Sequence, residues 1–313
     1  MSKFELMGRK VAATLMRRLP VQVRRIRVLR DKAYIALGAG GWDDNDELDR
    51  RWPSALQMTR GRRSGMRMKL DLTDWLQRRA YFTGRFYQED LEDLLRALLR
   101  SGDNFVDIGA NIGLVTLHAA PLVGQKGSLW AFEPNPEAFA RLAEHMSLNG
   151  LQARLFNAGL GSEVSTLTLR RFGRHTGKAT LVERPDALME SVSVSVVRGD
   201  EALEKLDVSK PTVFKIDVEG FEVPVLQGLG NLLDHEIAVI IEVSPTWLKL
   251  AGSSAELLYR ELERHGLKPY RFRLQEGRFT RKLNVASFAD RPTEQYDCLF
   301  MRPDSIFARR LGV

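Results

Sequence analysis

The stretch "VFKIDVEGFE" contains two carboxylates, Asp217 and Glu219, which follow the predicted strand Val213–Ile216. A carboxylate at the rim of a cleft can accept the proton of a substrate hydroxyl or orient the substrate. Glu242 ends the predicted strand Ala238–Val243 and is a rim acid of the same kind. We therefore expect Asp217 or Glu219 to be a general base, with Glu242 as the reserve candidate. The alternative is that such acids only favour a helix N-terminus.

A further acid, Glu133, lies in the stretch "SLWAFEPNP". Glu133 follows the predicted strand Leu129–Phe132, and Pro136 is well placed to begin a helix. A carboxylate at the tip of the second strand is where a ribose diol is bound in nucleotide folds, because it accepts from both hydroxyls. Glu133 is therefore predicted to bind a ribose, although it would also suit a helix cap.

The stretch "NFVDIGANIGLVT" predicts the turn that brings these acids to one ligand. Gly109 and Gly113 allow a tight turn and a close backbone approach, and the following helix directs its amides into the same cleft. Asn111 stands where a dinucleotide-binding turn has its middle glycine, which disfavours a pyrophosphate. The turn therefore favours a ligand without a pyrophosphate, with an ordinary glycine-rich loop as the alternative. Asn157 and Ala158, in "FNAGLG" at the end of the third strand, are placed where an adenine edge could lie.

The elements that must position these residues alternate between strands and helices. Such alternation predicts a parallel sheet covered on both faces, with ligands beyond the carboxyl ends of its strands. The remaining predicted strands are Phe105–Ile108, Ala153–Phe156, Tyr270–Leu274 and Tyr296–Met301, and the predicted helices are Gln88–Arg100, Pro136–Asn149, Val223–Leu233 and Ser254–His265. "MRMKLDL" predicts an earlier strand, and "STLTLRR" with "ESVSVSVVRG" predicts an inserted β-hairpin.

Other chemistries lack their residues. The five histidines show no metal-ligand spacing, Cys298 is the only cysteine, and we predict no metal site. Neither a serine nucleophile elbow nor a phosphate-binding Walker loop is present. His145 and His265 fall in amphipathic helices and are expected on the surface, and His175 is a weak candidate to reach the cleft.

Together, "FVDIGANIGLVT", "WAFEPNP", "FNAGLG" and "VFKIDVEGFEVPVLQGL" resemble the FkbM family of S-adenosylmethionine-dependent methyltransferases over roughly Leu70 to Arg302. The resemblance implies a class I, Rossmann-like α/β fold with a seven-stranded, mostly parallel sheet whose last strand is antiparallel. It also implies S-adenosylmethionine as cofactor: Gly109–Gly113 would surround its methionine part, and Glu133 would hold its ribose. Asn135, Asn157 and Ala158 would lie near its adenine, and Asp217 near its amino group and methyl group. The cofactor-binding residues would be Asp107, Gly109, Ala110, Asn111, Gly113, Thr116, Glu133, Pro134, Asn135, Asn157, Ala158 and Asp217.

The family further implies methylation of a hydroxyl oxygen on a sugar, glycolipid or natural product. Two alternatives remain open at this point. One is a nicotinamide-dependent oxidoreductase, which Asn111 and the lack of a paired Tyr/Lys or His/Arg constellation oppose. The other is a non-catalytic module that binds a membrane or a partner protein through its N-terminus.

The net charge of +7 lies at that N-terminus. Residues 1–32 hold ten Lys or Arg against two acids, a net of +8, so the rest of the 313-residue chain carries −1. A basic amphipathic helix predicted in this arm would lie on an anionic membrane or pack on protein. The body lacks the basic excess of a nucleic-acid-binding protein. We expect a basic arm and linker over 1–65 and a methyltransferase domain over 66–313. The protein is expected in the cytoplasm, with peripheral contact with the membrane as the alternative.

Overall fold

The structure is a computed structural model. It describes residues 55–85, 88–171, 179–182, 190–276, 281–288 and 290–313, together with Met7, Gly8, Val11 and Trp52. The predicted amphipathic helix of the arm therefore lies outside the described residues, apart from Met7, Gly8 and Val11. The stretch over 37–49, whose glycines and acids predict a loop or linker, and His175 also lie outside them. Among the described residues, no helix combines the length and the apolar character needed to cross a bilayer.

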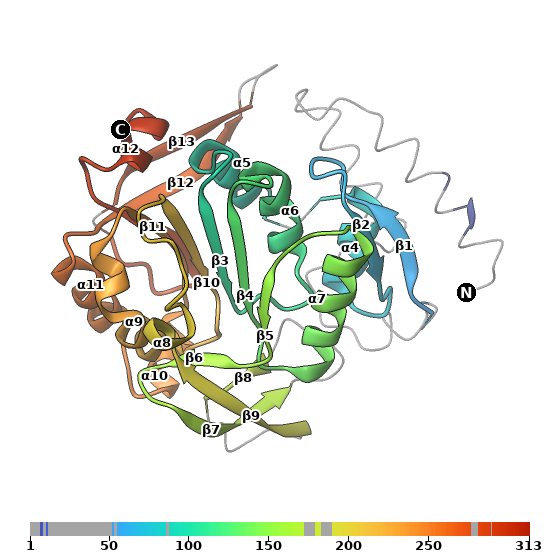
Figure 1. The fold of residues 1–313 in the computed structure, drawn as a ribbon, viewed down its shortest axis with the longest axis horizontal. Coiled ribbons are helices and arrows are strands. Elements are labelled where there is room, and N and C mark those ends of the chain that lie inside the picture. The colour runs from blue at the N-terminus through green and yellow to red at the C-terminus, as the bar shows by residue number, and fades with distance from the viewer. Residues whose placement is uncertain are drawn as a thin grey trace. The chain divides into compact units, whose positions relative to one another are not determined.

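An eight-stranded sheet with the order β13-β12-β14-β11-β10-β3-β4-β5 organises the chain (Figure 1). Its strands are β3 (Asn104–Ile108), β4 (Ser128–Phe132), β5 (Arg154–Phe156), β10 (Thr212–Ile216), β11 (Ile237–Val243), β12 (Lys268–Glu276), β13 (Arg281–Ser287) and β14 (Tyr296–Met301). The strands β11, β10, β3, β4 and β5 run parallel to one another, and β14 is antiparallel to both β11 and β12. This confirms the expected class I fold with an antiparallel last strand.

Seven strands of the sheet were expected from the sequence, and β13 is an addition at its edge. The predicted helices are α5 (Glu89–Leu98), α7 (Pro136–Leu148), α9 (Glu222–Leu229), which continues as a 3-10 turn over Gly230–Asp234, and α11 (Ala255–Arg264). The other helices are α4 (Trp75–Thr83), α6 (Leu114–Val123), α8 (Gly199–Ala202), α10 (Pro245–Leu250) and α12 (Ile306–Leu311). The expected strand "MRMKLDL" is β2 (Arg67–Leu70), which pairs with β1 (Gln57–Arg60).

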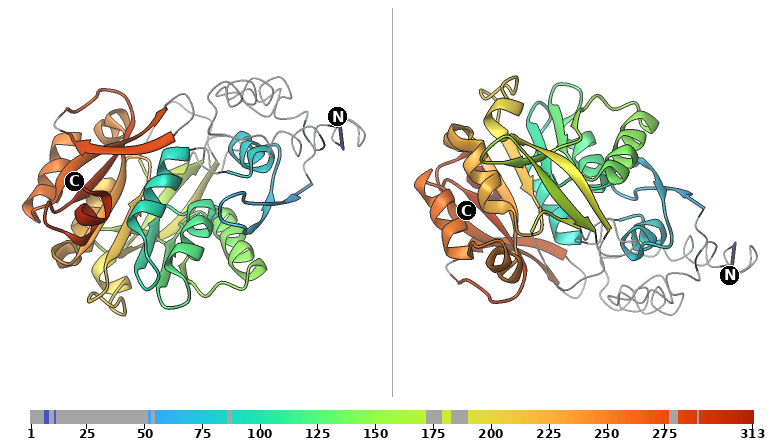
Figure 2. Two further views of the ribbon diagram at one scale, coloured as in Figure 1. Left: turned by 90° about the horizontal axis from the view of Figure 1, so that it is seen from above. Right: turned by 90° about the horizontal axis from the view of Figure 1, so that it is seen from below.

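A second, four-stranded sheet is inserted between β5 and β10. Its strands are β6 (Gly159–Gly161), β7 (Ser165–Arg171), β8 (Ala179–Thr180) and β9 (Glu190–Arg198), in the order β6-β9-β7-β8. The predicted hairpin is present as the antiparallel β7–β9 pair, and β6 and β8 extend it. Figure 2 shows these yellow-green strands as a layer separate from the main sheet.

The functional edge of the main sheet follows from its strand order. Strands β3, β10 and β11 are buried along their whole length, which explains their mainly apolar sequences. The chain runs outward from β3 through β4 and β5, and then returns to place β10 on the other side of β3. The order reverses between β3 and β10, and ligands bind such sheets beyond the carboxyl ends at that point. The residues after Ile108 and Ile216 therefore lie at the expected ligand-binding edge.

The chain divides into two compact units. One contains the described residues up to Glu92 and Arg273–Asn284, and the other contains Asp93–Phe272 and Val285–Val313. In the first unit the buried Arg85 guanidinium forms ion pairs with Glu89 and Glu92 at 2.7 and 2.8 Å. The boundary that we predict between residues 65 and 66 stays a prediction, and it falls in the connection between the paired strands β1 and β2.

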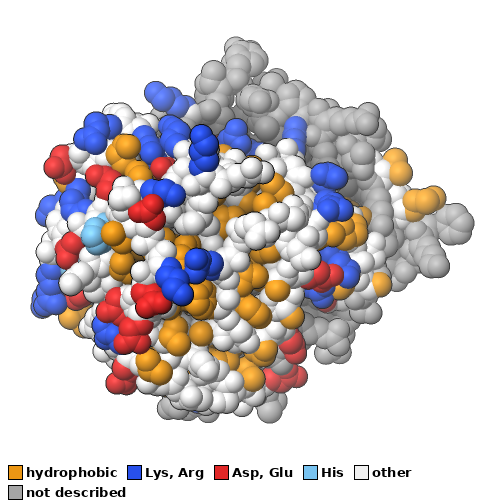
Figure 3. Space-filling model, viewed as in Figure 1, with side chains coloured by type: hydrophobic (Ala, Val, Ile, Leu, Met, Phe, Trp, Pro, Cys, Tyr) orange, Lys and Arg blue, Asp and Glu red, His pale blue; other side chains and the backbone are white. Residues whose placement is uncertain are grey.

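Both signs of charge are distributed over the described surface. Figure 3 shows Lys and Arg side chains interspersed with Asp and Glu side chains on one face. This mixture agrees with the net charge of −1 that the sequence places outside residues 1–32.

Candidate active site

The turn after β3 adopts the left-handed conformation at three of its five residues. The φ angles of Gly109, Asn111 and Gly113 are 78°, 50° and 83°. Asparagine tolerates this region better than most side chains, so Asn111 fits a turn that glycine would otherwise occupy. The two glycines face protein atoms: a Cβ on Gly109 would lie 1.8 Å from the carbonyl oxygen of Asp217, and one on Gly113 would lie 2.5 Å from Leu142 Cδ1. The glycines therefore serve close packing inside the protein.

Glu133 joins this turn to the next strand. Its Oε2 accepts from the backbone N–H of Asn111 at 2.7 Å, and its Oε1 accepts from that of Asn135 at 2.8 Å. Burial raises the pKa of Glu133 to about 7, and the two backbone donors oppose that rise. The carboxylate thus lies at the carboxyl end of β4, where the sequence predicts a ribose-binding acid, and each oxygen keeps a lone pair for a further donor.

Asp107 and Thr116 lie beneath the turn and are fully buried. The Thr116 hydroxyl donates to Asp107 Oδ2 at 2.6 Å, whereas Asp107 Oδ1 has no hydrogen-bond partner among the described residues. Asn111 Oδ1 is likewise buried without one. Unpartnered buried oxygens are uncommon in folded proteins, and they suit a ligand that brings donors into the site.

The residues expected near an adenine have structural partners of their own. The side chain of Asn135 caps α7 by accepting from Glu137 N at 3.1 Å. Asn157 donates its side-chain amide to the carbonyl oxygens of Glu133 and Pro134 at 2.9 and 3.1 Å. These bonds tie the ends of β4 and β5 together, and Ala158, which follows directly, is buried. Asn135 and Asn157 lie at the carboxyl edge of the sheet, and their side-chain hydrogen bonds stabilise the loops there.

His145 was expected on the surface, and this is wrong. It is fully buried on α7, and its Nδ1 lies 2.7 Å from the carbonyl oxygen of Ile112. An amphipathic helix places such a residue inside when a partner for the ring is available, here the turn between β3 and α6. His145 therefore supports the turn from below.

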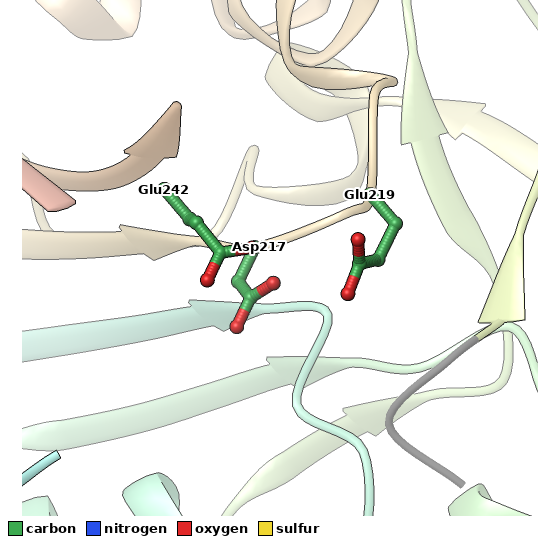
Figure 4. Close-up of side chains that lie close together, drawn as sticks. All are labelled: Asp217, Glu219 and Glu242. Atoms are coloured by element: carbon green, nitrogen blue, oxygen red, sulfur yellow. The ribbon is translucent and has the colours of Figure 1, made fainter. Parts of the chain in front are cut away.

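Asp217, Glu219 and Glu242 come together at the carboxyl ends of β10 and β11. Their carboxylate oxygens lie within 4.8 Å of one another, and Figure 4 shows Asp217 between the other two. Among the described residues this is the one group with the geometry to hold a metal ion, although the sequence predicts no metal site. Glu219 adopts a left-handed φ of 48°, a strained conformation for glutamate that is typical of functional sites.

Lys215 provides the cluster with a cation. Its Nζ donates to Asp217 Oδ2 at 2.9 Å, and parallel pairing places Lys215 beside Asp107 on β3. Burial lowers the pKa of the Lys215 ammonium, but attraction to Asp217 and Asp107 outweighs it and raises that pKa. Alternation along a strand places Lys215 and Asp217 on one face, but the sequence alone does not show that the two residues pair.

Glu242 differs from its two neighbours because it is buried, with 6% of its surface exposed. Burial raises its pKa well above the ordinary value, and the charges of Asp217, Glu219 and Asp297 add to that rise. Asp297 is its register partner on β14. The sequence did not indicate Asp297, because only the antiparallel pairing of β14 with β11 brings it to this edge. The arrangement favours the neutral form of Glu242, which cannot accept a proton.

Comparison with known proteins agrees with this geometry. The Methyltransferase FkbM domain profile matches residues 107–269. The chain is similar to the hexuronic acid methyltransferase AglP of Haloferax volcanii, with 32% identity over 155 residues that are 49% of this chain and 62% of AglP. It is also similar to methyltransferase 1 of Beauveria bassiana, with 33% identity over 167 residues that are 45% of this chain and 65% of that protein. Each match therefore spans less than two thirds of the relative.

Similarity to solved structures is looser. The crystal structure of precorrin-6y C5,15-methyltransferase from Geobacter metallireducens aligns with a TM-score of 0.38 and 15% identity, covering 69% of this chain and 89% of that protein. The fold is therefore assigned from the strand order of this chain itself.

Proposed function

Because the chain belongs to the methyltransferase FkbM domain family, we propose that it transfers a methyl group from S-adenosylmethionine to a hydroxyl oxygen of an acceptor. The observation that carries the proposal is the convergence at one sheet edge of Glu133 with the cluster of Asp217, Glu219 and Glu242. The first residue suits the ribose of the cofactor, and the cluster suits a reaction that releases a proton.

The charges of the site fit this cofactor. S-adenosylmethionine carries a positive sulfonium and a positive ammonium group. The carboxyl groups of Asp107, Asp217 and Glu242 surround the ammonium of Lys215, and Glu219 lies beside Asp217. The unpartnered Asp107 Oδ1 and Asn111 Oδ1 offer acceptors to a ligand with donors. The pyrophosphate of a nicotinamide dinucleotide would bring two negative charges beside these acids, which opposes the oxidoreductase alternative.

The residues of the chain would divide the work of the reaction. When bound, S-adenosylmethionine supplies an electrophilic methyl group. Glu133 would hold the ribose, and Asp217, fixed by Lys215, would face the cationic part of the cofactor. Glu219 would accept the proton of the acceptor hydroxyl, because its carboxylate lies beside Asp217 at the rim and is partly exposed. Asp217 is the second candidate for the base, and Glu242 is the third because its neutral form is favoured.

The acceptor class is proposed to be a sugar, a glycolipid or a hydroxylated natural product. AglP, whose printed name describes it as a hexuronic acid methyltransferase, favours the sugar. Contact of residues 1–32 with an anionic membrane is proposed as the means of reaching a lipid-linked acceptor, and these residues lie outside the described structure, apart from Met7, Gly8 and Val11.

Ligand-induced thermal stabilisation tests the cofactor. We expect S-adenosylhomocysteine to raise the melting temperature and NAD to leave it unchanged, because a ligand that binds only the folded state stabilises it. Labelled methyl transfer into an extract, followed by identification of the product, then tests the reaction and finds the acceptor. Stabilisation by NAD alone would support the oxidoreductase. Stabilisation by neither cofactor, with binding to anionic vesicles, would support the non-catalytic module.

Cofactor affinity is expected to fall at acid pH. The pKa of Glu133 is raised to about 7, so lowering the pH through 7 protonates the carboxylate that would accept from the ribose hydroxyls. Affinity should be full above pH 7 and fall roughly 10-fold per unit below it, which is roughly 30-fold at pH 5.5. Calorimetric titration with S-adenosylhomocysteine at several pH values measures this.

Glu133→Gln provides the matched control for that titration. The amide keeps the shape of the side chain but does not titrate, so its weaker binding should not change between pH 5.5 and 8. Wild-type affinity that is constant over the same range would contradict the role given to Glu133.

A further inference from the structure

The turn Val218–Gly220 carries the proposed base, and its backbone is strained. Glu219 and Gly220 have φ angles of 48° and 102°, and both lie in the left-handed region. A glutamate does not adopt this conformation without support from its surroundings. The direction in which the Glu219 carboxylate points therefore depends on whatever fixes this turn.

Contacts on several sides hold the turn. The hydroxyl of Thr180 donates to the carbonyl oxygen of Glu219 at 2.7 Å. The next amide, Gly220 N–H, donates to Glu222 Oε1 at 3.0 Å. Trp247 packs so closely that a Cβ on Gly220 would lie 2.9 Å from its carbonyl oxygen. Glu222 and Trp247 belong to the helices that flank the turn, whereas Thr180 reaches it from the inserted sheet.

Thr180 is well suited to act as a rigid support. It is 1% exposed, and its Oγ1 also accepts from Val182 N at 3.0 Å, which defines the direction of its hydroxyl proton. It lies on β8, where it pairs with Arg170 of β7. Thr180 and Glu219 are 39 positions apart in the sequence, so this bond connects the inserted sheet to the carboxylate cluster.

We infer that Thr180 is a positioning residue for the transfer reaction, which holds the carbonyl of Glu219 so that its carboxylate stays beside Asp217 and Glu242. The inference rests on the proposed function, because it assigns Glu219 as the base. It also gives the inserted sheet a role: β8 and the base are joined by a buried hydrogen bond, so a shift of the insert changes the position of the proton acceptor.

The test compares Thr180→Val with Thr180→Ser. Valine has the shape of threonine but no hydroxyl, so we expect kcat to fall about 10-fold, the rate equivalent of one hydrogen bond, while affinity for S-adenosylhomocysteine stays within about 2-fold. Serine restores the hydroxyl and should restore most of kcat. Thr168→Val, at an exposed position on β7 of the same sheet, is the matched control and should match the wild type.

Hydrogen exchange separates a failure of this inference from a failure of the proposed function. The amides of Val218–Phe221 should exchange faster in Thr180→Val than in the wild type or in Thr168→Val, whether or not methyl transfer occurs. Unchanged exchange, or a kcat of Thr180→Val equal to that of the wild type, would overturn the positioning role. A wild-type protein that neither binds S-adenosylhomocysteine nor transfers methyl would instead overturn the proposed function, and with it the role of Thr180 in the reaction.

Discussion

Glu219→Gln is expected to reduce methyl transfer by about 10²- to 10⁴-fold, which is the usual contribution of general base catalysis. The amide keeps the size of the side chain but cannot accept the proton of the acceptor hydroxyl. Affinity for S-adenosylhomocysteine should change little, because the carboxylate of Glu219 is assigned to the acceptor. The measurements are kcat on the identified acceptor and calorimetric binding of S-adenosylhomocysteine.

Asp217→Asn should differ from Glu219→Gln in its pattern of effects. Asp217 pairs with Lys215 at 2.9 Å and is assigned to the cationic part of the cofactor. Its neutralisation leaves the buried ammonium of Lys215 without its nearest partner, so both kcat and cofactor affinity should fall. If instead Asp217→Asn alone abolished turnover at unchanged affinity, Asp217 would be the base.

Glu163→Gln is the control for both variants, since Glu163 is an exposed acid between β6 and β7. If Glu219→Gln and Asp217→Asn both retained near wild-type turnover, the assignment of these carboxylates would be wrong.

Loss of activity on chelation, with recovery on adding Mg²⁺, would reassign Asp217, Glu219 and Glu242 to a cation site, because their oxygens lie close enough together to share one ion.

Gly109→Ala is expected to destabilise the protein by about 2 to 5 kcal/mol and to weaken cofactor binding. The added Cβ would lie 1.8 Å from the carbonyl oxygen of Asp217 and 2.9 Å from its carbonyl carbon. Both of these Asp217 atoms belong to the backbone, so the strands β3 and β10 must separate locally. Overpacking costs about 1–3 kcal/mol. A left-handed φ of 78° costs an L-residue about 1–2 kcal/mol more. Urea denaturation measures the loss in the free energy of unfolding.

Gly150→Ala is the control that separates the two terms. Gly150 has a φ of 62°, yet no atom lies within 4 Å of the position of its Cβ. It should lose only the backbone term, about 1–2 kcal/mol, and should bind S-adenosylhomocysteine like the wild type. Equal destabilisation by the two substitutions would show that the contact with Asp217 does not matter.

Much of the fold was predictable from local patterns. Apolar stretches such as Ala238–Ile241 marked the buried parallel strands, and the acids Asp107, Glu133, Asp217 and Glu242 marked the ligand-binding edge. This works because burial on both faces favours apolar side chains along a strand, so polar residues gather near its end. The strand β13 and the full inserted sheet were not foreseen. Their alternating residues satisfy the strand pattern only when the pairing partner is known.

By itself, the sequence determined the strand ends, and with them that Asp107, Glu133, Asp217 and Glu242 share one edge of the sheet. Tertiary structure decided the contacts among them. The approach of Asp297 to Glu242 and the bond from Thr180 to Glu219 join residues that are distant in the chain. Strand pairing also places Lys215, which pairs with Asp217, beside Asp107 of β3. The two glycines of the first turn show the same division: the sequence indicates a tight turn, but only the packed sheet shows that Gly109 is required by the carbonyl of Asp217. Local spacing sets which face a side chain occupies, whereas its partner and its charge state depend on burial and on strand register.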